Sequence, residues 1–151
     1  MNVSIYEHKR VGFTGTRSGL TLVQQEKLKQ LLTALKPLEF HHGDCQGADG
    51  EAANMADRMG EARPVIVCHP PVTQYKRAYA PHDEKRPPAG HFKRNRAIVD
   101  ETDLLIGCSV AQQRQEEGGT WYTISYAEKK GKPRFVVWPD GTVAYPEDNV
   151  P

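Results

Sequence analysis

Short apolar runs alternate along the chain with longer segments in which apolar residues recur at helical spacing. The apolar runs predict five buried strands, at residues 11–14, 38–42, 64–68, 103–108 and 134–138. The first long segment places leucines at i, i+3, i+4 and i+7 from Leu28, which predicts one apolar helix face. Thr21 and Gln24 have the spacing of a capping box, which predicts the start of this helix.

The same pattern predicts three further helices and leaves one long irregular segment. One helix is expected to begin near Asp49, with that residue as its N-cap, and the others to cover residues 91–101 and 119–130. Residues 70–90 contain five prolines and no clear periodicity, so we expect a long loop that serves as a lid, a binding loop or a mobile segment. Asp140-Gly141 predicts a short hairpin near the C-terminus.

This order of elements predicts the fold class. Strands that are separated by helices pair in parallel through right-handed crossovers. We therefore expect an α/β, Rossmann-like fold, with a mainly parallel sheet of about five strands flanked by helices. Residues 1–151 are expected to form a single domain. Ligands of such sheets bind beyond the carboxyl ends of the strands, so the loops that follow the strands are the places to look for a site.

Composition and charge exclude several classes of protein. The 151 residues carry 20 Lys and Arg against 19 Asp and Glu, a formal net charge of +1, which disfavours a nucleic-acid platform that depends on bulk charge. With 38% hydrophobic residues the chain can bury a core, unlike an acidic disordered chain. No run of apolar residues is long enough to span a membrane, and the first residues lack the apolar core of a signal peptide. Three unevenly spaced cysteines fit a reducing compartment, so we expect a cytoplasmic protein.

The loop after the first predicted strand has the residue types of a phosphate-binding turn. Gly15 permits close backbone approach, Thr16 and Ser18 offer hydroxyls, and Arg17 offers a planar guanidinium. An ordinary glycine-rich turn with a solvated arginine would look the same. The glycine spacing differs from the dinucleotide fingerprint, and no Gly-Lys-Ser/Thr of a P-loop follows, so a hydride-transfer enzyme is disfavoured.

Two more segments contribute candidate residues at the same edge. In the second loop, Gly43 permits close approach, and Asp44 could accept a hydrogen bond from a ligand hydroxyl or a base amine. The basic run at 93–96 is typical of a solvated helix face, and within it Arg94 and Asn95 gain weight only through the resemblance described below.

The fourth candidate segment is the glycine-rich start of the helix predicted at 119–130. Gly118 and Gly119 would expose backbone N–H groups to an anion, and Thr120 could cap the helix and contact a phosphate oxygen. A plain loop-to-helix junction is the alternative. Trp121 could flank a base or pack in the core. Two glycine-rich helix starts with nearby arginines at one edge favour an anion site more strongly than one such helix start does by itself.

Five motifs in a fixed order cover most of residues 10–139. They are GFTGTRSGLT (12–21), HHGDCQGAD (41–49), CHPP (68–71), KRNRAIVDETDLLIGC (93–108) and GGTWYTISYAEKKGKP (118–133). Together they resemble the SLOG superfamily, which is related to the Rossmann-like domain of DprA/Smf proteins and to the LOG ("lysine decarboxylase-like") proteins. The likeness is to small stand-alone bacterial and phage members of the superfamily.

The resemblance implies a site for a nucleotide or a nucleotide-derived ligand. In LOG-type enzymes an arginine–asparagine helix and a glycine-rich loop hold the ribose phosphate, and the N-glycosidic bond of a nucleoside monophosphate is cleaved. Arg94 and Asn95 match the first element, and the glycine loop at 118–120 matches the second in part. Trp121 follows that loop where the family continues towards glutamates, so the catalytic candidates are Arg94 with Glu116, Glu117 or Asp44 as a substitute carboxylate.

These observations predict a nucleotide-binding protein with three alternatives for its role. It is expected to act as a sensor, sponge or processing protein, with a nucleoside 5′-monophosphate phosphoribohydrolase as the enzymatic alternative. A DprA-like adaptor for single-stranded DNA or protein, working through residues 70–90, is the third, although near-zero charge disfavours nucleic acid. No cofactor is expected. Trp121, Tyr122 and Tyr126 on one helix could serve a homodimer interface.

Thiol and imidazole groups also gather near the predicted strand ends. Soft and imidazole ligands on one edge could hold zinc, but no Cys-x-x-Cys or His-x-x-x-His pair is present, so no metal is expected. The groups concerned are Cys45, Cys68, Cys108, His41, His42 and His69.

Overall fold

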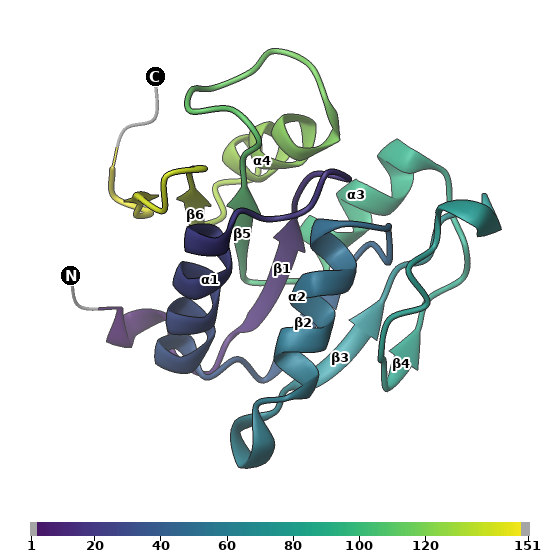
Figure 1. Ribbon diagram of the computed structural model, residues 1–151, viewed down its shortest axis with the longest axis horizontal. Helices are drawn as coiled ribbons and strands as arrows, with labels where there is room; N and C mark the ends of the chain where they lie inside the picture. The colour runs from purple at the N-terminus through teal and green to yellow at the C-terminus, as the bar shows by residue number, and fades with distance from the viewer. Residues whose placement is uncertain (1–2, 149–151) are drawn as a thin grey trace.

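The computed structural model describes residues 3–148 and contains a seven-stranded sheet in the order β4-β3-β2-β1-β5-β6-β7 (Figure 1). The strands are β1 Arg10–Thr14, β2 Glu39–His42, β3 Val65–Cys68, β4 Glu84–Lys85, β5 Leu104–Cys108, β6 Arg134–Val137 and β7 Val143–Ala144. All neighbouring strands are parallel except β6 and β7, which form the hairpin predicted at Asp140-Gly141. The predicted Rossmann-like α/β fold is therefore confirmed.

Four α-helices cover the two faces of the sheet. They are α1 Leu22–Leu35, α2 Ala48–Asp57, α3 His91–Asp100 and α4 Gly119–Lys129, accompanied by the 3₁₀ turns η1 Ser4–Tyr6, η2 Gly60–Ala62 and η3 Gln74–Lys76. Helices α1 and α2 pack with Phe13 and Phe40 in one core cluster, whereas α3 and α4 pack with Leu105 and Val136 in the other. Apolar side chains alternate between the two faces because successive residues of a strand point to opposite sides. Within residues 3–148, no helix combines the length and the apolar character that a membrane crossing needs.

Helix α1 begins as its capping signature predicts. The Thr21 hydroxyl accepts a hydrogen bond from the Gln24 backbone N–H at 3.1 Å, and the Gln24 side chain accepts from the Thr21 N–H at 3.0 Å. Gln24 also donates to the carbonyl oxygens of Ser109 and Val137, at 2.7 and 3.1 Å. The cap therefore also ties α1 to the ends of β5 and β6.

The 70–90 segment differs from the predicted long loop, because it adds a strand to the edge of the sheet. Glu84 pairs with Val67 and Lys85 pairs with Cys68 in parallel register. The Asp83 carboxylate accepts a hydrogen bond from the Ile66 N–H at 2.8 Å and pairs with Arg63 at 2.7 Å. A two-residue strand is too short to show a period-2 pattern, which explains why it escaped prediction.

Two predicted helix caps are wrong, and both corrections concern the site. Gly47, not Asp49, is the N-cap of α2, and Gly118, not Thr120, is the N-cap of α4. Both glycines have positive φ, +93° and +98°, a region that residues with a Cβ rarely adopt. A Cβ on Gly47 would also lie 2.3 Å from the carbonyl oxygen of Arg17. As a result, neither helix has a side-chain cap on its first N–H groups.

Candidate functional site

The loops at the carboxyl edge of the sheet enclose a cavity of about 280 Å³. Walls come from the ends of β1 and β2, the first turns of α3 and α4, and the segment that leads into α4. Eight of the predicted binding residues line it: Gly15, Thr16, Arg17, Arg94, Asn95, Gly118, Gly119 and Thr120. Glu117, a predicted catalytic candidate, also lines it. The structure thus brings most of the predicted residues together.

Arg94 has a buried guanidinium group whose hydrogen-bond donors are only partly satisfied by the described part of the protein. It lies on the buried face of α3, is 5% exposed, and donates from Nη2 to the Cys45 thiol at 3.2 Å. Its Nε has no hydrogen-bond partner in residues 3–148. More than about nine in ten buried polar groups are hydrogen-bonded in native proteins. Because Arg94 also lines the cavity, its guanidinium group is available to an acceptor bound there.

The start of α4 supplies backbone donors to the same cavity. Gly118 turns the chain, and Gly119, Thr120 and Trp121 follow as the first helical residues. The first N–H groups of a helix have no partner within the helix, and the helix dipole makes this end partly positive. Trp121 is 3% exposed and donates from its indole N–H to the Ser109 hydroxyl at 3.1 Å. Its ring packs in the core of the α3–α4 layer and also forms part of the cavity wall.

The loop after β1 is held in place by the start of α2. A Cβ on Gly15 would lie 2.5 Å from the Cβ of Ala48, and the Thr16 carbonyl accepts a hydrogen bond from the Ala48 N–H at 3.0 Å. The Thr16 and Ser18 hydroxyls lie 3.1 Å apart. Arg17 is exposed, and its guanidinium has no hydrogen bond or ion pair within the described part of the chain. The loop therefore presents a free cation on a rigid base.

Three predicted residues do not line the cavity. Ser18 lies beyond it, and Gly43 lies behind Arg94, where a Cβ would be 3.3 Å from Arg94 Nε. Asp44 is fully buried and accepts hydrogen bonds from Arg77 Nε at 2.6 Å and from the Ala80 N–H at 3.0 Å. These contacts occupy its carboxylate in anchoring the 70–90 segment.

Three titratable residues of the cavity, Asp49, Cys45 and His91, were not predicted as site residues. Asp49 is 8% exposed and accepts a hydrogen bond from the Cys45 N–H at 3.2 Å. Burial raises the pKa of Asp49 to about 7, although this hydrogen bond and the charge of Arg94 oppose the rise. Burial likewise raises the pKa of the Cys45 thiol. Burial, followed by Arg94 and Arg17, lowers the pKa of His91. The sequence does not mark Asp49 as a site residue, because an N-cap role is sufficient to explain an aspartate at the start of a helix.

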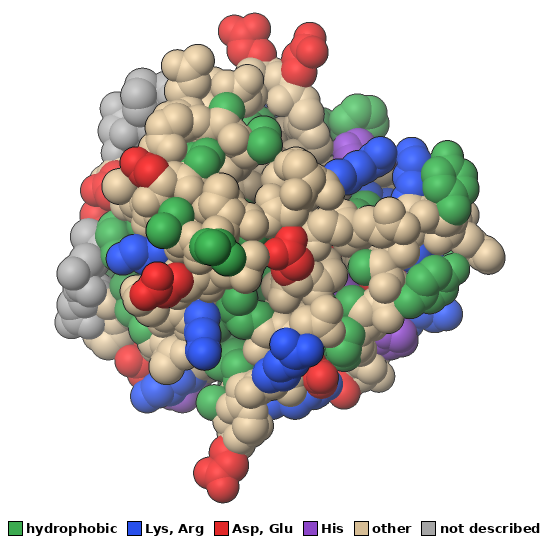
Figure 2. Space-filling model, viewed as in Figure 1, with side chains coloured by type: hydrophobic (Ala, Val, Ile, Leu, Met, Phe, Trp, Pro, Cys, Tyr) green, Lys and Arg blue, Asp and Glu red, His purple; other side chains and the backbone are tan. Residues whose placement is uncertain are grey.

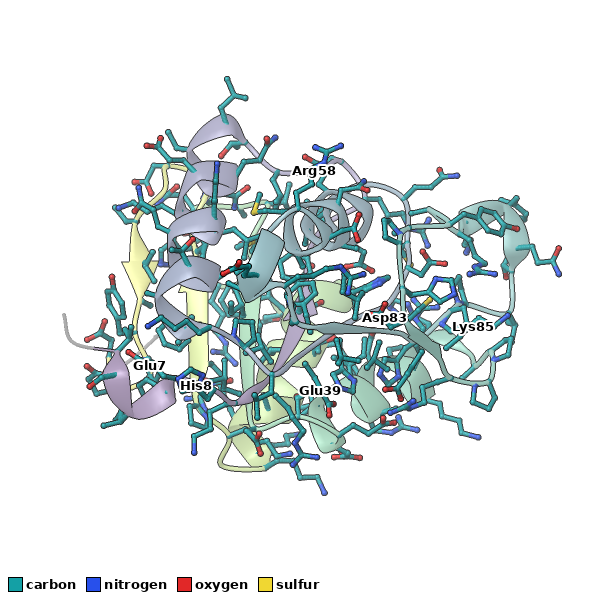
Figure 3. All side chains as sticks on the ribbon, turned by 90° about the horizontal axis from the view of Figure 1, so that it is seen from below. Glu7, His8, Glu39, Arg58, Asp83 and Lys85 are labelled. Carbon is teal, nitrogen blue, oxygen red and sulfur yellow. The ribbon has the colours of Figure 1, made fainter. Side chains whose placement is uncertain are left out.

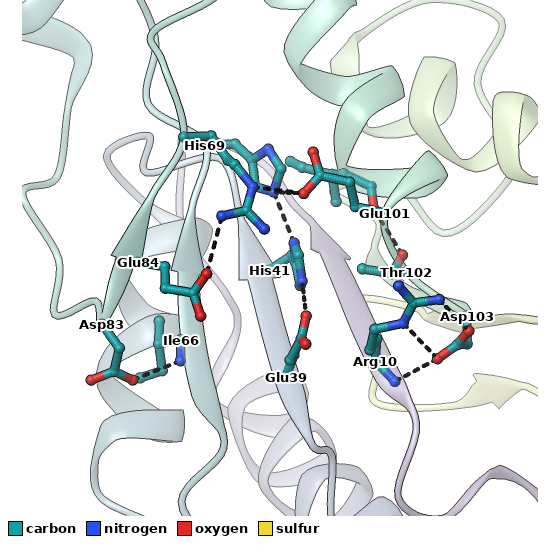
Figure 4. Close-up of polar contacts among 12 residues, drawn as sticks. Arg10, Glu39, His41, Ile66, His69, Asp83, Glu84, Glu101, Thr102 and Asp103 are labelled. Atoms are coloured by element: carbon teal, nitrogen blue, oxygen red, sulfur yellow. Dashed lines mark hydrogen bonds and ion pairs between the residues drawn. The ribbon is translucent and has the colours of Figure 1, made fainter.

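Among residues 3–148, two groups of side chains outside the cavity have ligand atoms close enough to hold a metal. His41, His69 and Glu101 form the first, drawn in Figure 4. There His41 Nδ1 lies 2.8 Å from His69 Nε2, His41 Nε2 lies 2.7 Å from Glu39, and Arg86 donates to Glu101 at 2.7 Å. These mutual contacts already use the atoms that a metal would need.

The second such group is His42, Asp44 and Cys68. Burial raises the pKa of Cys68 to about 12, which opposes formation of the thiolate that zinc binds. The Asp44 carboxylate is already paired with Arg77. Of the three cysteines, only Cys68 belongs to either group, because Cys45 lies at the cavity and Cys108 in the core.

Comparisons with known proteins identify the fold. No family model matches the sequence, and the search of curated proteins found no match. Among solved structures, the molybdenum cofactor binding protein of Rippkaea orientalis matches with a TM-score of 0.66 at 20% identity, over 87% of this chain and 77% of that chain. DprA of Streptococcus pneumoniae matches with a TM-score of 0.62 at 17% identity, over 85% of this chain and 50% of that chain.

A third solved structure has the same architecture. TM1055, a structural genomics target, matches with a TM-score of 0.57 at 18% identity, over 83% of this chain and 72% of that chain. At such identities the likeness concerns the fold. These matches show the Rossmann-like α/β fold that the sequence predicts.

Proposed function

We propose that the cavity binds the ribose phosphate of a nucleotide or a nucleotide-derived ligand. The observation that carries this proposal is the buried guanidinium group of Arg94, which lines the cavity beside the uncapped start of α4 and forms no ion pair within residues 3–148. A phosphate placed there would accept hydrogen bonds from the guanidinium and from the backbone N–H groups of Gly119 and Thr120. Arg17 would add a second cation at the entrance.

Asn95 would orient the sugar. Asn95 is 7% exposed and lines the cavity next to Arg94 on α3, so its amide can both donate to and accept from ribose hydroxyls. Asp44, predicted for this role, is committed to Arg77. We therefore assign the sugar contact to Asn95 alone.

The test is a comparison of nucleotide binding by two matched arginine variants of α3. Arg94→Gln removes the buried charge and should weaken binding of the nucleotide by about tenfold or more, since a hydrogen bond to a charged group contributes roughly 1.5–3 kcal/mol. Arg96→Gln is the control, because Arg96 donates to the Tyr122 hydroxyl at 2.9 Å and does not line the cavity. Calorimetry with a panel of nucleotides gives the dissociation constants. Equal binding by wild type and Arg94→Gln would overturn the proposal.

The panel should include the molybdenum cofactor, because the matching Rippkaea orientalis protein is described as binding it. It should also include single-stranded DNA, because another match is a DNA processing protein. The adaptor alternative would work through residues 70–90, where Tyr75 and Tyr79 are 78% and 62% exposed. DNA binding that survives Arg94→Gln would favour that alternative over a nucleotide site.

Hydrolysis of the N-glycosidic bond is the second candidate function. The observation in its favour is that two carboxyl groups, Glu117 and Asp49, line the same cavity. A nearby carboxylate stabilises the cation-like sugar of such a transition state. Chromatography of the calorimetry samples decides the point: free base that disappears with Glu117→Gln but persists with Glu116→Gln would establish an enzyme, and intact nucleotide would establish a binding protein.

A further inference from the structure

A second, smaller compartment adjoins the cavity. It has a volume of about 60 Å³ and shares four residues with the cavity: Arg17, Cys45, His91 and Arg94. Its remaining walls come from the 70–90 segment and include Lys76. A ligand bound at the start of α4 could therefore extend past Arg94 into this compartment.

The compartment carries an unneutralised positive charge. Arg17, Lys76 and Arg94 all line it, and none of them forms an ion pair within residues 3–148. Figure 2 shows Lys and Arg side chains and a histidine gathered over the region where Figure 1 places α3 and the 70–90 segment. The pKa of His91 is lowered by burial first, and then by these same three cations. Clustered cations without acidic partners repel one another, so they indicate an anionic ligand.

The size of the compartment limits what can enter it. The compartment is much smaller than the cavity, about 60 Å³ against about 280 Å³, and its cationic lining suits a compact anionic group. One phosphate at the start of α4 would engage Arg94 and the backbone N–H groups. Lys76, which lines the smaller compartment and not the cavity, would then remain without an anion.

We propose that the ligand carries two adjacent phosphoryl groups, as in a nucleoside diphosphate, with the second phosphate between Arg17 and Lys76. This inference rests on the proposed nucleotide-binding function and specifies the class of nucleotide. The second phosphate would be held by one guanidinium and one ammonium group, both of which suit phosphate oxygens.

The backbone places Lys76 at this position. In η3, the Lys76 N–H donates to the Thr73 carbonyl at 3.1 Å, and the Lys76 carbonyl accepts from the Gln46 N–H at 3.0 Å. The next residue, Arg77, is anchored to buried Asp44. Because all of these contacts spare the Lys76 side chain, Lys76→Ala should remove the ammonium group and leave the segment folded.

The experiment is calorimetry on the full chain with nucleotides that differ by one phosphate. The probes are the 5′-monophosphates and 5′-diphosphates of adenosine, guanosine, cytidine and uridine, with inorganic phosphate and pyrophosphate, at constant ionic strength and with a chelator present. For the nucleoside that binds, the diphosphate should bind about tenfold more tightly than the monophosphate, which corresponds to about 1.4 kcal/mol. Equal affinities would overturn the inference.

Two lysine variants test the position of the second phosphate. Lys76→Ala should abolish the preference for diphosphate and leave monophosphate affinity within about twofold of wild type. Lys85→Ala is the matched control, since Lys85 is an exposed lysine on β4 outside both compartments (Figure 3). A preference that survives Lys76→Ala, or an equal loss of both affinities, would contradict the assignment.

The probes separate failure of this inference from failure of the proposed function. Monophosphate binding without a preference for diphosphate would leave the nucleotide site standing and overturn the inference. Pyrophosphate that binds as tightly as any nucleoside diphosphate would support the two-phosphoryl site and overturn the nucleotide proposal. No binding by any probe would overturn both.

Discussion

Two arginines near the carboxyl edge show how differently a buried cation can be used. Arg77 pairs with Asp44 at 2.6 Å, and this pair holds the 70–90 segment against the sheet. Within residues 3–148 the Arg94 guanidinium has only the Cys45 thiol as a hydrogen-bond partner, although Arg94 is the more buried of the two arginines. Burying a charge without full pairing costs free energy. The fold sustains that cost at Arg94, which is what a preformed anion site requires.

Asp49 should make anion binding depend on pH. Its pKa of about 7 means that it is neutral at pH 6 and ionised at pH 8, where its negative charge opposes an anion beside Arg94. We expect sulfate, whose charge is constant over this range, to bind at least about threefold more tightly at pH 6 than at pH 8. Titration by thermal shift at constant ionic strength measures the effect.

The Asp49→Asn variant is the control for this pH dependence. The variant cannot ionise, so its sulfate affinity should stay constant between pH 6 and 8 apart from smaller contributions of other groups. The same carboxyl affects folding: because its pKa is raised on folding from its ordinary value of 3.8, its stabilising contribution is largest below pH 3.8 and declines as the pH rises towards 7. An unchanged pH dependence in Asp49→Asn would show that another group is responsible.

At the scale of elements, the helix N-termini differ in whether a side chain caps them. Helix α1 has both members of a capping box, so its first N–H groups are satisfied within the protein. Helices α2, α3 and α4 begin after Gly47, Gly90 and Gly118 without any side-chain cap. At α2 the Thr16 carbonyl takes the Ala48 N–H. The start of α4 therefore offers uncapped backbone donors to the cavity.

The conformation of Gly118 should matter for both stability and binding. It has φ +98° and ψ 152°, a region open essentially to glycine alone, and a Cβ there would meet nothing within 4 Å. Gly118→Ala should therefore cost about 1–3 kcal/mol through backbone strain and should weaken nucleotide binding as the start of α4 shifts. Urea denaturation and calorimetry measure the two effects.

Gly60 provides a matched substitution away from the site. It also has positive φ, +62°, and open space around its Cβ position, but it lies in η2. Gly60→Ala should lower stability by about 1 kcal/mol and leave binding unchanged. If Gly118→Ala lowers stability only, the start of α4 does not hold the phosphate.

At the scale of the whole molecule, the sheet buries three histidines as neutral groups. Burial lowers the pKa of His42 to about 4 and that of His69 to about 3, and it also lowers the pKa of His41. His41 and His69 lie between β2, β3 and the end of α3, where Glu39, Glu101 and Arg86 surround them (Figure 4). His42 accepts a hydrogen bond from the Asp44 N–H at 3.0 Å on the opposite face.

These histidines should make the fold sensitive to acid. In the unfolded chain they bind protons near pH 6.5, whereas in the native state they do so only at lower pH, so their stabilising effect is present above pH 6.5 and is lost as the pH falls towards 4. We expect the urea midpoint to fall over this interval. His42→Gln should flatten the dependence, and exposed His8→Asn should not; equal slopes in all three proteins would contradict the assignment. Asp49 contributes a pH dependence of stability with the opposite sign over part of this range. This contribution is common to the three proteins, so the comparison of their slopes isolates the histidine.

The fold followed from the sequence because local signals and the global arrangement agree. The leucine spacing of α1, its Thr21–Gln24 cap and the five apolar runs each specify an element without reference to the rest of the chain. Two-residue β4 carries no such signal, since its pairing is fixed by Asp83 and Arg63 across the sheet edge. The cap of α4 was misassigned because the geometry of Gly118 depends on the loop before it.

The sequence by itself determined which loops meet, because parallel strands place the residues that follow them at one edge. That is why Arg17, Arg94 and Thr120 line one cavity. Only the tertiary structure decided which polar groups remain free there. Asp44 and Asp49 lie five positions apart in the sequence, yet one is paired with Arg77 and the other stays in the cavity with a raised pKa. Such differences arise from burial and from partners distant in sequence, which no local pattern encodes.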